Sequence, residues 1–279
     1  MSQNSWFKIR DRERSSFYVA RQQTRWLVFL YFVAGMASAS APTRSSIPTA
    51  EAIVARMAQA RAENRTHLRP YTVTRDYKLF GKDTSTAKSE VFADVAFVPP
   101  ASKNYTIGET NGSGLGQILV RRMLANEVDV TRDYVSTDYS AENYDFRFLR
   151  EADLSGQHCY VFELLPRRIE DHLLHGDIWV DAKTYLLRRF EGELAKTPSW
   201  WVKDVSVTFV YSDVGGMWLQ TATEAAADVR IFGPTTMVSR DVKYKITELV
   251  ATKSSVQINV LELLPGGPLR PGAIPTPPK

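Results

Sequence analysis

Alternation of large apolar and polar residues dominates the sequence after residue 70. From Tyr71 to Leu79 every second residue is large, and from Val205 to Tyr211 valines and aromatics alternate with polar residues. A period of two is typical of strands with one buried face. The same pattern, bounded by turn residues, predicts further strands at 90–98, 103–108, 144–149, 159–165, 177–181, 186–194, 218–231 and 242–246.

Only two segments show the period of an amphipathic helix. Thr49 can cap a helix over residues 50–64, whose apolar residues recur every three or four positions. Residues 115–134 follow a glycine-rich loop and form the second. Two helices are too few for the crossovers of a parallel sheet, so we expect an antiparallel one. Because so wide a sheet must curl or close, the sequence predicts an α+β fold: a curved antiparallel sheet forming an incomplete β-barrel, with helices covering the concave face.

The first 39 residues have the pattern of a secretory signal peptide. Basic residues precede the apolar run Trp26–Ala37, and the small residues Ala37-Ser38-Ala39 form a cleavage site. The alternative is a retained anchor, but twelve residues span only about 18 Å of the roughly 30 Å hydrocarbon core. We therefore expect a periplasmic protein. The domain organisation expected is a signal peptide at 1–39, a linker at 40–48, the folded domain at 49–253, and a C-terminal segment at 254–279 that ends in a Pro/Gly-rich disordered tail.

The net charge of +4 does not indicate a nucleic-acid partner. Residues 1–39 hold six basic and two acidic residues, so the leader carries the whole excess and the rest of the chain is neutral. The single cysteine, Cys159, excludes a disulfide framework and a thiolate zinc site, and its context predicts a buried strand residue.

No pattern in the chain points to catalysis, a cofactor or a metal. Gln117 stands where a dinucleotide-binding loop needs its third glycine. His172 and His175 lack a third ligand, and no G-x-S-x-G motif is present. We expect a protein that is not an enzyme and has no cofactor.

Tryptophan is abundant, and four of the six lie between residues 179 and 218. Aromatic residues in this number can form the core, or they can line an apolar pocket for an acyl chain. The candidate lipid-binding residues are Trp179, Phe209, Tyr211 and Trp218. Alternation places half of each strand on the inner face without saying which half.

Several segments together resemble one family of exported proteins. They are Asn143–Phe146, Gly156–Pro166, Gly176–Asp181, Arg188–Glu193, Pro198–Val202 and Phe209–Leu219. Over roughly residues 50–250 the chain resembles the LolA-like superfamily, the outer-membrane lipoprotein-sorting-like proteins. The resemblance implies an incomplete antiparallel barrel closed by helices around a hydrophobic cavity for lipid or acyl chains.

The resemblance and the pattern lead to one functional expectation. We expect a monomeric periplasmic carrier that binds lipid or an acylated lipoprotein, with the helices at 50–64 and 115–134 as a lid. Its other partners would be inner- or outer-membrane transport proteins. The alternative is a periplasmic sensor that binds a membrane partner protein such as an anti-sigma factor.

Overall fold

The computed structural model describes residues 48–196, 202–230, 233–252, 255–263 and 270–271. The chain divides into two units, residues 1–46 and residues 47–279, and all the described helices and strands belong to the second. The predicted signal peptide and most of the predicted linker lie outside the described residues. Within the described part, no helix is long and apolar enough to cross a bilayer.

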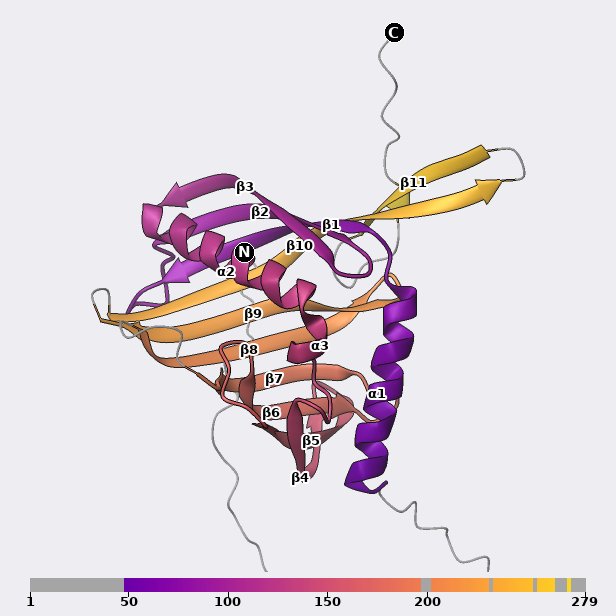
Figure 1. The fold of residues 1–279 in the computed structure, drawn as a ribbon. Helices are drawn as coiled ribbons and strands as arrows, with labels where there is room; N and C mark the ends of the chain where they lie inside the picture. The colour runs from indigo at the N-terminus through magenta and orange to yellow at the C-terminus, as the bar shows by residue number, and fades with distance from the viewer. Residues whose placement is uncertain (1–47, 197–201, 231–232, 253–254, 264–269, 272–279) are drawn as a thin grey trace, which may run out of the picture. The chain divides into compact units, whose positions relative to one another are not determined.

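Three helices and twelve strands make up the described part of this unit (Figure 1). The helices are α1 (Ala50–His67), α2 (Gly114–Arg132) and α3 (Tyr134–Thr137). The first six strands are β1 (Tyr71–Phe80), β2 (Ser89–Val98), β3 (Ser102–Gly112), β4 (Tyr144–Leu154), β5 (Gln157–Pro166) and β6 (Leu174–Asp181). The others are β7 (Leu187–Leu194), β8 (Val202–Val214), β9 (Met217–Val229), β10 (Gly233–Thr252), β11 (Ser255–Leu263) and β12 (Arg270–Pro271).

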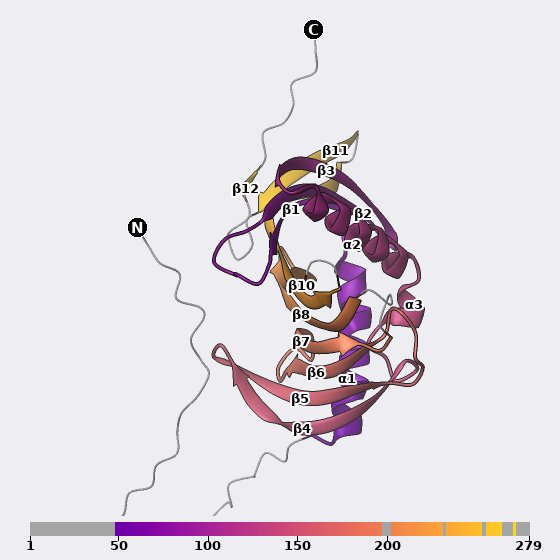
Figure 2. The same cartoon turned by 90° about the vertical axis from the view of Figure 1, so that its left-hand side faces the viewer.

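All strand pairs are antiparallel, and the order is β3-β2-β1-β10-β9-β8-β7-β6-β5-β4. Strands that follow one another in the sequence are neighbours in the sheet from β1 to β3 and from β4 to β10. The two groups are joined by the pairing of β1 with β10, a strand far along the chain. The edge strands β3 and β4 do not pair with each other in the described residues. The sheet is therefore an open, incomplete barrel, and Figure 2 shows it curving from β4 and β5 to β1–β3.

One row of directly paired residues crosses the sheet. Directly opposed residues on neighbouring strands point to the same face, so the row identifies that face on each strand. It runs through Phe148, Phe162, Ile178, Phe190, Phe209, Thr223, Ser239, Tyr77 and Val91.

Both long helices lie on the face marked by this row, which we call the helix-bearing face. Tyr77 belongs to a buried cluster that includes Leu124 of α2. Phe162 belongs to a second buried cluster, which includes Ile53 of α1. Helix α2 lies along β1–β3, while α1 crosses one end of the strands (Figure 1). That the helices cover the concave side stays a prediction.

A buried group of charges fastens α2 to the sheet. Arg75 of β1 donates from Nε to Asp241 Oδ1 at 2.6 Å and from Nη1 to Glu127 Oε2 at 2.7 Å. Lys103 of β3 donates to the other oxygen of Glu127 at 2.7 Å. These four residues, which we call the Arg75 cluster, join β1, β10, α2 and β3. Tyr244 donates a further hydrogen bond to Asp241.

Most of the predicted elements are confirmed, with boundaries shifted by a few residues. Thr49 caps α1, accepting a hydrogen bond from the amide of Ala52 at 3.3 Å. Strands β11 and β12 continue the sheet beyond residue 253, into the segment expected to end in a disordered tail. The alternation of apolar and polar residues at 256–260 is the sequence signal that could have predicted β11. The other residues of that tail lie outside the described ones.

Replacing Glu127 with Gln should lower stability in a pH-dependent way. Burial alone would raise the pKa of Glu127, but Arg75 and Lys103 together lower it to about 2. The unfolded value is about 4.3, so the stabilisation is present above about pH 5 and is lost as pH falls toward about 2. We expect Glu127→Gln to cost about 3 kcal/mol at neutral pH, measured by urea unfolding.

The control is Asp129→Asn, which removes the same charge from the exposed side of α2, where Asp129 pairs with Arg132. Exposed pairs contribute at most about 1 kcal/mol, so this variant should follow the wild-type pH dependence. An equally steep acid loss in wild type and Glu127→Gln would contradict the role given to Glu127.

Candidate functional site

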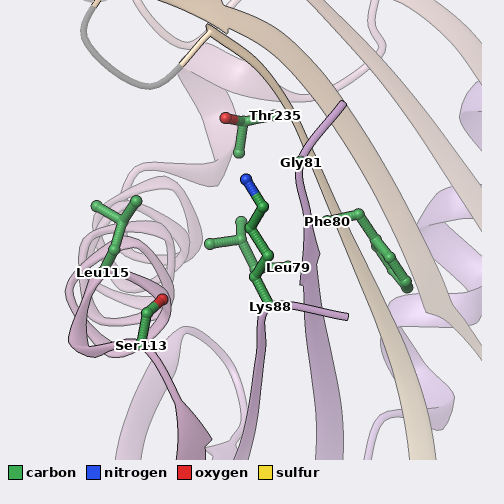
Figure 3. Close-up of a pocket in the computed structure, with 7 residues that line it drawn as sticks. All are labelled: Leu79, Phe80, Gly81, Lys88, Ser113, Leu115 and Thr235. Atoms are coloured by element: carbon green, nitrogen blue, oxygen red, sulfur yellow. The ribbon is translucent and has the colours of Figure 1, made fainter. Parts of the chain in front are cut away.

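A pocket lies where the β1–β2 hairpin, the start of α2 and the start of β10 meet (Figure 3). Its volume is about 230 Å³. The lining residues are Leu79, Phe80, Gly81, Lys88, Ser113, Leu115 and Thr235. Hydrophobic side chains and the aliphatic stem of a lysine thus form much of the wall, with hydroxyl groups and one ammonium group beside them.

Main-chain contacts around Lys88 hold the pocket together. The Lys88 amide donates to the carbonyl of Leu79 at 2.7 Å, and the Ser113 amide donates to the carbonyl of Lys88 at 3.2 Å. Gly112 has a φ of +87°, and a Cβ there would lie 2.3 Å from the Lys88 carbonyl oxygen. Only glycine fits this position, so the residue determines how α2 departs from β3.

The first turn of α2 rests directly on β2. A Cβ on Gly116 would lie 2.1 Å from Ser89 Oγ, so the absence of a side chain lets the helix approach the strand. The Ser89 hydroxyl is 3.1 Å from each of the carbonyl oxygens of Asn111 and Ser113, to which it donates. This close approach holds the first turn of α2 against β2, beside the pocket.

Gly81 makes room for the side chain of Lys88. A Cβ at residue 81 would lie 2.2 Å from Lys88 Nζ and 2.4 Å from Cε. Figure 3 shows the lysine side chain extending past Gly81 toward Thr235, with Leu115 on its other side. Among the described residues, no carboxylate forms an ion pair with this ammonium group.

Two of the predicted lipid-binding residues, Phe209 and Tyr211, are partly buried and pack against the core cluster that includes Ile53 of α1. Phe209 stacks on Phe190 with ring centroids 5.7 Å apart, and both lie on the helix-bearing face. The Tyr211 hydroxyl is 3.2 Å from that of Tyr139. Burial raises the pKa of Tyr211 to about 12. Both rings pack against this cluster, and neither lines the pocket.

The two predicted tryptophans lie in different surroundings. Trp179 alternates with Ile178 and Val180, which are fully buried in the α1 cluster, so it points to the opposite face. Trp218 donates from Nε1 to the carbonyl of Leu187 at 2.6 Å. Asn64 of α1 hydrogen-bonds to both main-chain groups of Trp218, at 2.8 and 3.0 Å.

Trp179 therefore points away from the face that carries Phe209, and the main chain of Trp218 is bonded to α1. That the four residues line a lipid-binding cavity stays a prediction. Sequence reasoning missed the pocket residues Leu79, Lys88, Leu115 and Thr235. The only local signal was the run of glycines at 112–116, which we interpreted as a flexible loop; in the structure it is the end of β3 and the start of α2.

The other candidate groups are accounted for by ordinary packing and ion pairs. Within the described ranges no three His, Cys, Asp or Glu side chains gather in a way that could hold a metal ion. His175 Nδ1 lies 3.4 Å from Glu193 Oε1 in a partly exposed pair. Cys159 is buried in β5 as predicted, and burial raises the pKa of its thiol to about 11.

Comparison with known proteins gives structural similarity only. No family model matches the chain, and no curated protein matches it. A LolA superfamily protein from Nitrosomonas europaea is similar at 13% identity over 73% of this chain and 96% of that one, with a TM-score of 0.37. A putative outer membrane lipoprotein-sorting protein domain from Vibrio parahaemolyticus is similar at 12% identity over 72% and 90%, with a TM-score of 0.38.

A third similar structure is the MucA/MucB complex of Pseudomonas aeruginosa, at 12% identity over 68% of this chain and 92% of that one, with a TM-score of 0.23. The family that the sequence resembles is thus among those with similar structures. At these identities and TM-scores the likeness supports no inference about function, and the open sheet is established by the strand pairing of the chain itself.

Replacing Gly112 with Ala should destabilise the protein because of its positive φ and the close Lys88 carbonyl. Strain of this kind costs about 1–3 kcal/mol, and we expect that loss in urea unfolding. The matched control is Gly114→Ala, where an added Cβ meets nothing within 4 Å. Because Gly114 is in a helix, this control should be neutral or stabilising by up to about 1 kcal/mol. Equal stabilities for the two variants would contradict the constraint at Gly112.

Proposed function

We propose that this chain is a periplasmic, LolA-like binding protein that shelters the apolar end of an acyl chain and catalyses no reaction. The observation that carries the proposal is the pocket of about 230 Å³ between α2 and the β1–β2 hairpin. The expected location follows from the signal pattern at residues 1–39.

The size of the pocket suits the tip of a chain. An apolar cavity of roughly 150 Å³ can hold benzene, whereas sites for drug-sized ligands begin at about 300 Å³. Each buried methylene contributes about 0.8 kcal/mol, so six would contribute about 5 kcal/mol before the costs of binding. A dissociation constant of about 1 mM corresponds to about 4 kcal/mol, so tighter binding requires more of the chain to be buried.

Helix α2 is the element that could enlarge the pocket. Its Glu127 is held by two cations, whereas its first turn meets β2 through the close contact of Gly116 with Ser89. Movement of the first turn away from β2 would lengthen the pocket along the helix-bearing face while leaving the Arg75 cluster intact. In this proposal the start of α2 takes the lid role expected of the helices at 50–64 and 115–134.

The decisive test places a charge in the pocket without disturbing the fold. Leu115 lines the pocket in the first turn of α2. Leu115→Glu adds a carboxylate where a helix tolerates one well, so stability should be kept. We expect a fluorescent acyl probe to bind the wild-type exported chain and to bind Leu115→Glu at least about tenfold more weakly, a difference of about 1.4 kcal/mol.

The matched control is Ile118→Glu, one turn further along α2, where the side chain is 65% exposed. This variant carries the same added charge and should bind the probe like wild type. Native mass spectrometry of the wild-type protein provides a second readout through any co-purified acyl species. Failure of the wild type to bind acyl probes would overturn the proposal and favour the partner-binding sensor.

A further inference from the structure

We propose that Lys88 makes the pocket selective for acyl chains with an anionic head group, a carboxylate or a phosphate. The inference rests on the proposed function, because it adds a head-group preference to a site already assigned to an apolar tail.

The first argument is the charge of the pocket. Lys88 is an exposed residue that lines the pocket alongside Leu79 and Leu115, so its ammonium group can meet the polar end of a chain whose tail enters the pocket. Two lysines of the neighbouring strands are paired instead: Lys78 with Glu90 at 3.1 Å and Lys103 with Glu127 at 2.7 Å. Lys88 forms no ion pair with a carboxylate in the described part of the chain, so its charge is available to an anionic ligand.

The second argument is that the hairpin fixes the main chain of Lys88 and leaves space for its side chain beside the pocket. Its main chain is fixed by hydrogen bonds with Leu79 and Ser113. Its side chain occupies the space that a side chain at residue 81 would fill, since a Cβ there would lie within 2.4 Å of both Nζ and Cε. The glycine thus lets the ammonium group remain over the pocket.

A hydroxyl group adds a second donor to the same wall. Ser113 precedes α2, and its side chain makes no capping hydrogen bond to the helix. A carboxylate or phosphate at Lys88 could accept from this hydroxyl as well, whereas an alcohol head would gain no ionic contact. Charge-assisted hydrogen bonds are about twice as strong as neutral ones. The pocket would therefore bind a chain with an anionic head group more tightly than the same chain with an alcohol head group.

The experiment compares ligands that share one chain and differ only in the head. Dodecanol, dodecanoate and dodecyl phosphate displace a fluorescent acyl probe from the full exported chain at neutral pH and low salt. For wild type we expect the two anions to bind about three- to tenfold more tightly than the alcohol, the range for a partly exposed charged contact. High salt should reduce this preference.

Two variants and one control test the residue itself. Lys88→Gln should bind the two anions no more tightly than dodecanol, so the ratio of anion to alcohol affinity should fall to about one. Gly81→Ala retains the lysine but displaces its ammonium group, so the preference should fall there too. Lys82→Gln removes an exposed charge from the same hairpin loop, and it should behave like wild type.

Each outcome separates this inference from the proposed function. If wild type binds no chain, the proposed function fails. If it binds all three ligands equally, or if Lys88→Gln keeps the preference for the anions, acyl binding stands and the role of Lys88 is overturned. An equal loss for all three ligands in Lys88→Gln would also overturn it, because the stem and not the charge would then matter. If one of the two anions binds more tightly than the other, that preference shows whether the ligand's head group is a carboxylate, as in a fatty acid, or a phosphate.

Discussion

The buried guanidinium of Arg75 is the constraint around which one half of the sheet is arranged. A charge on a buried face is tolerated only when it is paired and hydrogen-bonded. Asp241 and Glu127 satisfy this requirement, and they come from β10 and α2. The same contacts therefore pin β1 beside a strand whose Asp241 is 166 residues further along the chain, and they hold α2 over the sheet.

Glycines at three positions around the pocket allow close contacts because they have no side chain. Gly112 turns the chain from β3 into α2, Gly116 lets the helix touch β2, and Gly81 leaves space for a lysine. Each contact is made at a distance that a Cβ would forbid. The pocket is therefore formed by backbone geometry and by a few apolar side chains, which explains why no sequence motif marks it.

Local patterns predicted the strands well because alternation directly reflects burial on one face. Tyr71–Leu79, for example, alternates in the structure as the sequence suggests. Alternation cannot show which distant strand lies alongside, so the pairing of β1 with β10 was not predictable from it. For the same reason, alternation could not show which candidate aromatic residues share a face, and Trp179 in fact points away from the face that carries Phe209. Lys88, at the end of a loop, carries no periodic signal.

Helix α2 is attached to the sheet in two physically different ways. Separating Glu127 from Arg75 and Lys103 would leave buried charges unpaired, and this costs several kcal/mol. Separating the first turn from β2 would break the hydrogen bonds from the Ser113 amide to Lys88 and from the Ser89 hydroxyl to Ser113, while the Ser89 bond to Asn111 could remain. Neutral hydrogen bonds contribute about 1 kcal/mol each, less than a buried ion pair costs to break. The end of α2 beside the pocket is thus held by neutral contacts, and the ionic cluster holds the later part of the helix.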